Sequence, residues 1–136
     1  YGDELGVQGY GGPFCRSTFP WESMDEIDPN AEMRTWIKEL AKLRKSAKAL
    51  SIGEFNYVHR IGFTYGYIRE YEDDKYIILG NFDSTMKDIR LDAARYGVTG
   101  LRVLLATDNC NCEYESCDGI FFIKTAPQSL VIFKAE

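Results

Sequence analysis

Residues 1–27 contain several glycines, two prolines and no sustained alternation of apolar and polar positions. Glycine and proline interrupt regular structure, so this segment predicts a long loop with at most a short strand or turn. Apolar residues then recur every three or four positions, which is the period of one helix face. They are Met33, Trp36, Ile37, Leu40, Leu43 and Ala47. We therefore expect one long amphipathic helix, with Asp28 or Asn30 as its N-cap and Pro29 in its first turn.

From Gly53 onward the apolar period becomes two, which is the period of half-buried β-strands. Residues 54–60 and 63–71 both alternate in this way, and a short polar loop before residues 75–82 indicates a hairpin. Further strands are expected at 86–91, 101–106, 120–124 and 129–134. Short strands separated by polar turns predict a mainly β fold: an antiparallel, Greek-key-like β-sandwich that follows the loop and the helix.

The composition is ordinary for a soluble globular domain, with 45% hydrophobic and 27% charged residues among 136. This length supports one hydrophobic core. No apolar run reaches the roughly 18 residues of a membrane span, so no membrane partner is expected. The net charge of −5 argues against nucleic acid as a partner. Residues 31–50 carry six basic and two acidic side chains, which we interpret as a solvated helix face rather than a polyanion site.

A series of short motifs runs in one order through the first part of the chain. They are Tyr1–Gly6, Pro13, Cys15–Arg16, Pro20–Trp21, Leu43–Lys45, Ala49–Leu50 and Gly53–Phe55. Their order resembles the end of the catalytic barrel in glycoside hydrolase family 13, the α-amylase superfamily, most closely its neopullulanase and cyclomaltodextrinase branch. Weaker matches at Arg69–Glu70, Asn81–Phe82 and Ser129–Phe133 resemble strands of the family's C-terminal β-domain.

The resemblance implies two parts. Residues 1–50 would be the C-terminal remnant of the catalytic (β/α)8 barrel, and residues 51–136 the C-terminal antiparallel β-domain. The chain starts without Met and without a secretory signal pattern, so we expect Tyr1 to lie inside a longer protein. By resemblance, that protein would be a retaining α-glucan hydrolase, which hydrolyses or transfers α-1,4-linked glucosyl units through a covalent glycosyl intermediate.

No catalytic residue is expected within this chain. The family's nucleophilic Asp, acid Glu and stabilising Asp lie on the fourth, fifth and seventh barrel strands, all of which would precede Tyr1. Asp3 and Glu4 are neighbours in what we expect to be an extended segment, where adjacent side chains point to opposite faces. They therefore do not make a catalytic pair, and the isolated chain should be inert.

Arg16 and Trp21 are the candidate substrate-binding residues. Arginine can donate several hydrogen bonds to sugar hydroxyls, and tryptophan can stack on a pyranose ring. The resemblance implies that the residue matching Arg16 contributes to donor-side glucose subsites, so the expected partner is an α-glucan or maltooligosaccharide bound through the barrel. Gly12 and Phe14 replace the acidic residues that usually flank Pro13. The alternative is that Arg16 pairs with a nearby carboxylate and Trp21 packs beneath the loop.

Three of the four cysteines, Cys110, Cys112 and Cys117, lie within eight residues. They could hold a soft metal if Cys15 or His59 supplied a fourth ligand, but structural zinc sites favour two-residue gaps between paired ligands. We therefore expect no metal, and reduced thiols as in an intracellular protein, with a Cys110–Cys117 disulfide as a further possibility. The sequence contains no phosphate-cradling glycine motif, and no cofactor is expected.

Two other functional classes fit the sequence. The β-domain could be a stand-alone carbohydrate-binding module, in which the aromatic strands between residues 55 and 71 form a sugar platform if their rings are exposed. It could instead be a structural or interaction domain that supports the barrel. The apolar helix stripe would then fold back on the sandwich or recruit a second copy, giving a homo-oligomer. Substrate preference, calcium dependence and compartment depend on parts outside this sequence.

Overall fold

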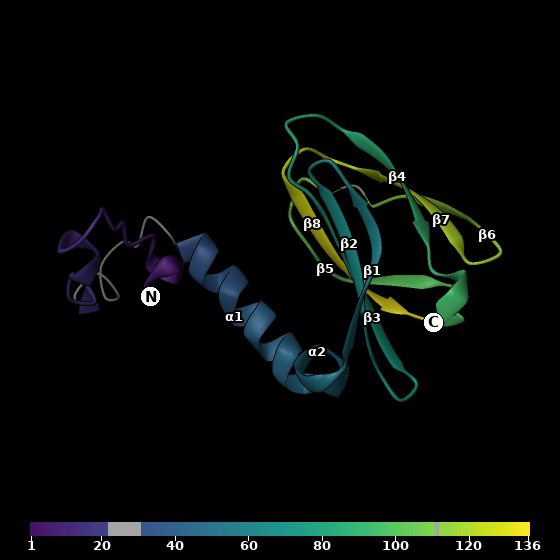
Figure 1. Ribbon diagram of the computed structural model, residues 1–136, viewed down its shortest axis with the longest axis horizontal. Coiled ribbons are helices and arrows are strands. Elements are labelled where there is room, and N and C mark those ends of the chain that lie inside the picture. The colour runs from purple at the N-terminus through teal and green to yellow at the C-terminus, as the bar shows by residue number, and fades with distance from the viewer. Residues whose placement is uncertain (22–30, 111) are drawn as a thin grey trace. The chain divides into compact units, whose positions relative to one another are not determined.

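Figure 1 shows the computed structural model of the chain, which describes residues 1–21, 31–110 and 112–136. These residues form two compact units, 1–46 and 47–136. The first contains turns and a helix, and the second contains a short helix and all the strands described below. The assignment of residues 1–50 to a barrel remains a prediction.

The first unit starts with two single turns of 3-10 helix, η1 (Asp3–Leu5) and η2 (Phe14–Arg16). Gly2 and Gly6 flank η1 in the left-handed conformation, which glycine adopts without strain. A Cβ at Gly2 would also lie 2.8 Å from the Val7 side chain. The loop predicted for residues 1–27 is thus present as far as residue 21, with turns in place of a strand.

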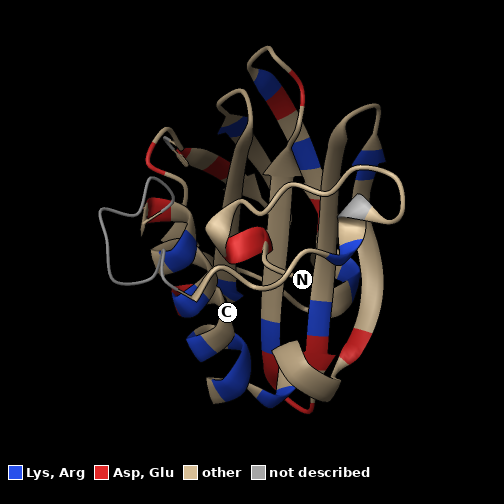
Figure 2. Cartoon of the chain, turned by 90° about the vertical axis from the view of Figure 1, so that its left-hand side faces the viewer, with Lys and Arg blue, Asp and Glu red and all other residues tan. Residues whose placement is uncertain are grey.

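The predicted amphipathic helix is α1 (Ala31–Ser46). Glu32 lies in its first turn, and Arg44 and Lys45 lie in its last turn, an arrangement that suits the helix dipole. Lys and Arg predominate among its charged residues (Figure 2), and none of its residues is buried. Neither described helix is long and apolar enough to cross a bilayer. Three residues expected at its N-terminus lie outside the described residues: Asp28, Pro29 and Asn30.

The second unit is an antiparallel β-sandwich, which confirms the predicted fold class. Sheet A has the strand order β1-β2-β3-β8-β5, and sheet B has the order β4-β7-β6. The strands are β1 (Glu54–Ile61), β2 (Thr64–Tyr71), β3 (Asp74–Asn81), β4 (Lys87–Asp92), β5 (Leu101–Ala106), β6 (Tyr114–Cys117), β7 (Ile120–Thr125) and β8 (Ser129–Ala135). The sequence did not predict β6, because its four residues are all exposed and show no alternation.

Side chains from one face of each sheet meet in a shared core. Ile77, Leu79 and Phe133 line this core from sheet A and are fully buried. Leu91 and Phe121 line it from sheet B and are buried to the same degree. Removing such a side chain from water contributes about 1.5–3 kcal/mol, so this interface between the sheets is the main source of stability.

One buried amide, Asn81 at the end of β3, bonds to two of the connections that cross between the sheets. Its Nδ2 group donates to the Thr85 carbonyl at 3.0 Å, in the β3–β4 connection, and to the Ala126 carbonyl at 2.8 Å, in the β7–β8 connection. Its Oδ1 accepts from the Asp83 N–H at 3.0 Å. The Gln128 N–H also donates to the Asp83 carbonyl, so the two connections are bonded directly to each other.

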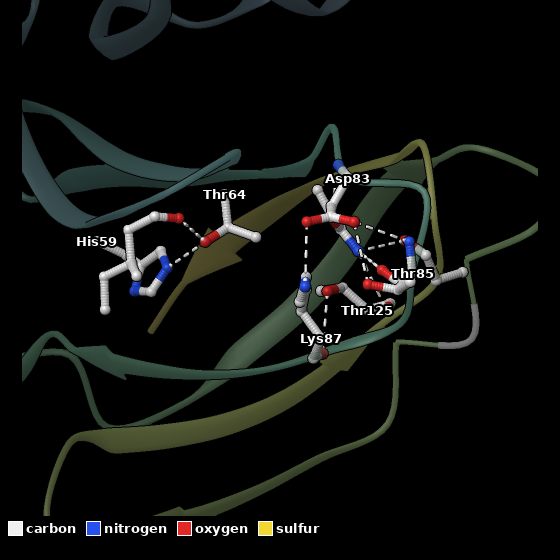
Figure 3. A network of polar contacts seen from close by, with 9 residues as sticks. His59, Thr64, Asp83, Thr85, Lys87 and Thr125 are labelled. Atoms are coloured by element: carbon white, nitrogen blue, oxygen red, sulfur yellow. Dashed lines mark hydrogen bonds and ion pairs between the residues drawn. The ribbon is translucent and has the colours of Figure 1, made fainter.

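The carboxylate of Asp83 fixes the start of β4 (Figure 3). It pairs with Lys87 Nζ at 3.0 Å and accepts from the Thr85 N–H at 3.0 Å. The ammonium group of Lys87, followed by the hydrogen bonds from Thr85, holds the pKa of Asp83 below its usual value. The Thr125 hydroxyl donates to the Lys87 carbonyl, which joins β4 to the end of β7.

Ala47 separates α1 from α2 (Lys48–Ile52), which corrects the expected continuation of the helical stripe through this residue. Ala47 has extended backbone angles and is only 3% exposed, so its burial belongs to the second unit. Ala49 and Leu50 of α2 are buried beside β2 and β3. At Gly53 a Cβ would lie 2.4 Å from the Ala49 carbonyl oxygen, so only glycine permits this close approach.

His59 lies half-buried in β1 and takes part in a local hydrogen-bond chain (Figure 3). The Thr64 hydroxyl donates to the Ile61 carbonyl at 2.7 Å, so it accepts from His59 Nε2, which lies 2.7 Å away. Burial lowers the pKa of His59, and a backbone hydrogen bond to Arg90 opposes this effect in part. The folded protein therefore favours the neutral imidazole.

We predict that Asn81→Ala lowers the free energy of unfolding by about 2 kcal/mol, because carbonyl groups of the β3–β4 and β7–β8 connections lose a buried donor. Urea unfolding monitored by circular dichroism measures the change. Asn109→Ala is the matched control: the exposed Asn109 side chain donates to the Pro127 carbonyl, and its loss should cost less than about 1 kcal/mol. Equal losses in the two variants would contradict the role assigned to Asn81.

We also predict that acid destabilises the fold through His59. Folding lowers the pKa of His59. The stability linked to this shift is therefore fully present above the pKa of His59 in the unfolded chain, about 6.5, and is lost as the pH falls through its pKa in the folded protein. The urea midpoint of the wild-type chain should therefore fall more between pH 7.5 and pH 5 than that of His59→Gln. Parallel pH profiles for the two proteins would assign the acid sensitivity to other groups.

Candidate functional site

Arg16 is the last residue of η2, and its backbone N–H donates to the Pro13 carbonyl at 3.0 Å. This turn exposes the side chain. Among the residues that the structure describes, the guanidinium group has no recorded ion pair or hydrogen bond, so the carboxylate partner considered as an alternative is not found there. Toward the part of the chain that the structure describes, Arg16 therefore keeps its guanidinium donors for solvent or a ligand.

Trp21 is 71% exposed, so its ring does not pack beneath the loop within the described residues. Its ring centroid lies 4.6 Å from that of Phe19, at an interplanar angle of 52°, and Phe19 in turn lies 6.4 Å from Tyr1. The three rings form an aromatic row with Trp21 at one end. One face of an indole held in this way can stack against the apolar face of a sugar.

A small hollow of about 200 Å³ lies in the same unit, lined by Tyr1, Asp3, Val7, Gln8, Gly9, Cys15 and Ser17. Neither Arg16 nor Trp21 lines it. The structure thus joins Trp21 to the aromatic row and leaves Arg16 on a separate turn. The assignment of both residues to sugar binding stays a prediction.

Asp3 and Glu4 lie in the 3-10 turn η1, which corrects the expectation of an extended segment. The reason is local: the left-handed glycines on both sides close the turn through a hydrogen bond from Gly6 N–H to the Asp3 carbonyl. Successive side chains of a 3-10 helix are about 120° apart, so the two carboxylates still diverge. The turn offers no paired-carboxylate geometry.

Cys110 and Cys112 form a disulfide, which corrects the expectation of reduced thiols and of a Cys110–Cys117 bridge. Their Cα atoms are 5.5 Å apart, within the range that a disulfide spans. Cys15 and Cys117 are free and exposed. A metal centre at these cysteines would need the two bridged sulfurs, and no group of potential metal ligands is found among the described residues.

The aromatic strands considered as a sugar platform are exposed in part. Phe55 is 48% exposed and Tyr57 is 50% exposed. However, the ring of Phe55 stacks on Tyr67 with centroids 4.8 Å apart, and its contact with Tyr57 is edge-on at 5.0 Å. The guanidinium group of Arg60 lies 5.7 Å from the centre of the Tyr57 ring. These rings are largely engaged with one another.

The sequence pattern did not point to the outer face of sheet B, which carries an open groove of about 640 Å³. Arg90, Glu115 and Phe122 are among the residues that line it. Alternation along β7 shows that Phe122 faces away from the buried Phe121, and this signal was available in the sequence. The sequence did not reveal which strands flank Phe122, because β4 and β6 are separate segments of the chain.

Comparison with known proteins gives consistent results. A cyclomaltodextrinase from Thermoanaerobacter pseudethanolicus is 32% identical over 92 residues, which are 68% of this chain and 16% of that protein. The crystal structure of a debranching enzyme from Nostoc punctiforme superposes with a TM-score of 0.81 and 24% identity, over 98% of this chain and 27% of that one. No family model matches the chain.

A third comparison extends the likeness of the fold to the whole chain. The α-amylase from Geobacillus thermoleovorans, in a complex with acarbose, superposes with a TM-score of 0.79 and 19% identity, over 100% of this chain and 28% of that one. At these identities the solved structures establish the fold, and the cyclomaltodextrinase adds similarity in sequence. The chain spans about a sixth of the length of that relative. This chain belongs to glycoside hydrolase family 13, the α-amylase superfamily, and corresponds to a C-terminal part of such a protein.

Proposed function

We propose that the full-length protein hydrolyses or transfers α-1,4-linked glucosyl units with retention, and that this chain is its C-terminal part. The observation that carries the proposal is the 92-residue similarity to a cyclomaltodextrinase. An α-amylase of the same fold forms a complex with acarbose, which supports a carbohydrate as the substrate class.

The retaining reaction needs two carboxyl groups about 5 Å apart. One carboxylate attacks the anomeric carbon while the other group, as an acid, protonates the departing glycosidic oxygen. Water or a second sugar hydroxyl then displaces the carboxylate and gives its proton to the former acid. Asp3 and Glu4 lack this geometry, so both catalytic groups would come from the barrel outside this chain.

Within this scheme Arg16 and Trp21 bind substrate. The exposed guanidinium group would donate to hydroxyl groups of a donor-side glucose unit, and the exposed indole would stack on a neighbouring ring. Both roles are positioning rather than bond-breaking. A barrel loop that follows the eighth strand opens on the active-site face, which is where such contacts are useful.

The second unit has a structural role in this proposal. A sandwich with a hydrophobic core between its sheets is a rigid support, and its short α2 is anchored by Ala49 and Leu50. The apolar stripe of α1 would cover the barrel, as expected for the last barrel helix. The competing role, a carbohydrate-binding platform at Phe55 and Tyr57, has less support because these rings contact one another.

The test is to express the complete coding sequence that contains this chain and to measure reducing sugar released from soluble starch and β-cyclodextrin. The full-length protein should be active, and residues 1–136 alone should not. In the full-length protein, Arg16→Ala and Trp21→Ala should each lower kcat/KM on maltoheptaose about tenfold, through loss of hydrogen bonds or stacking.

Two exposed residues of the second unit provide matched controls, Arg102→Ala and Phe63→Ala, which should leave kcat/KM unchanged. Activity of the isolated chain would disprove the assignment of catalysis to the missing barrel. Full activity of both substrate-site variants would remove Arg16 and Trp21 from the binding site while leaving the proposed reaction intact.

We further predict that the isolated chain self-associates, because the apolar stripe of α1 is only half-buried at Trp36, Ile37 and Leu40, and Met33 is 50% exposed. Static light scattering should show a mass that rises with concentration. Replacing Ile37 and Leu40 with Glu should restore the monomer, whereas Lys38→Glu and Lys42→Glu on the same helix should not. A constant monomeric mass for the unmodified chain would contradict this prediction.

A further inference from the structure

The outer face of sheet B combines one exposed ring with a polar border. β7 is the central strand of this sheet, and Phe121 and Ile123 point into the core. Because strand residues alternate, Phe122 between them points outward, and it is 50% exposed. This half-exposed ring at the centre of the sheet presents an apolar face that a ligand can contact.

The strand register places a charged residue on each side of this ring. Arg90 of β4 is the partner of Phe122 on one side, and Glu115 of β6 is its partner on the other. Side chains directly opposite in an antiparallel pair have Cβ atoms about 5 Å apart, so the three groups form one continuous row. Among the described residues, Phe122 has no recorded contact with another ring or with a cation.

A second row lies next to the first. Asp88 of β4 is the partner of Lys124 of β7, and Glu113 lies beside Lys124 through the hydrogen bond from the Lys124 N–H to the Glu113 carbonyl. Both rows line the same open groove of about 640 Å³, a volume within the usual range of ligand sites. The groove therefore presents an apolar ring and a double border of hydrogen-bonding groups.

The charges of this border indicate which ligands fit. Three carboxylates, Asp88, Glu113 and Glu115, and two cations, Arg90 and Lys124, lie within it. A polyanion would meet the carboxylates and a polycation would meet the cations, so neither is favoured. A neutral polyhydroxylated ligand can donate to the carboxylates and accept from the cations while its apolar face covers the ring.

We propose that this groove is a non-catalytic binding site for an α-1,4-glucan chain, with Phe122 as the stacking platform and Arg90 and Glu115 as hydrogen-bonding partners. The choice of an α-glucan among neutral saccharides rests on the proposed function of the full-length protein. An open groove admits a polymer at any point along its length, so the site would hold the protein on a polysaccharide and not select a chain end.

The test is a titration of the ¹⁵N-labelled chain with maltoheptaose at millimolar concentrations, followed by NMR. Amide shifts should change in β4, β6 and β7 and saturate. Phe122→Ala should weaken binding about tenfold, which corresponds to the loss of one stacked ring. Arg90→Ala should weaken it several-fold and provides a second variant, since its side chain is also exposed and its replacement leaves the core untouched.

Phe63→Ala is the matched control, because Phe63 is 67% exposed but lies in the turn between β1 and β2. This variant should bind like the wild type. Shifts that cluster at residues 55–71, the absence of saturable shifts, or unchanged affinity in both groove variants would overturn the proposal. Hydrolysis of starch by the full-length protein without groove binding would reject this site alone, whereas groove binding without any hydrolysis would reject the proposed reaction.

Discussion

The β-sandwich depends on one buried side chain, Asn81, at the point where the chain leaves sheet A. The described part of the chain crosses between the sheets four times, and the Asn81 amide bonds carbonyl groups in two of these connections, β3–β4 and β7–β8. Without a hydrogen-bond partner such as the Asn81 amide, burying the carbonyl groups of these connections would be energetically costly. The alignment of the two sheets, and with it the packing of Phe121 and Phe133 in one core, each against the Tyr114 ring, is consistent with this constraint.

The two outer faces of the sandwich differ in character. On sheet A, Phe55 and Tyr67 stack and form part of an aromatic surface of rings that contact one another. On sheet B, within the described part of the chain, Phe122 lies between charged neighbours in an open groove without a ring contact. Packed rings suit contact with protein, whereas a single ring with polar neighbours suits a hydrated ligand. The two faces therefore fit different tasks within one domain.

Periodicity in the sequence predicted the long helix and most strands, because alternation and helical spacing are properties of a single segment. It failed where long-range contacts decide the structure. Ala47 fits the helical stripe, yet its burial in the second unit ends α1 at Ser46. β6 has four exposed residues and is defined by its pairing with β7. The sequence did not predict the groove at Phe122 for the same reason. A motif nominated Arg16 and Trp21 as candidates, and their role in sugar binding stays a prediction.

The position of β8 in the sheet has a consequence for how the protein is made. β8 is the last of the described strands, but it lies between β3 and β5 and, among those strands, is the neighbour of β5 in sheet A. During translation β3 keeps an unpaired edge, and β5 has nothing to pair with, until residues 129–135 have left the ribosome. Such an edge is open to pairing with other chains. The nascent domain is therefore prone to aggregation until β8 inserts.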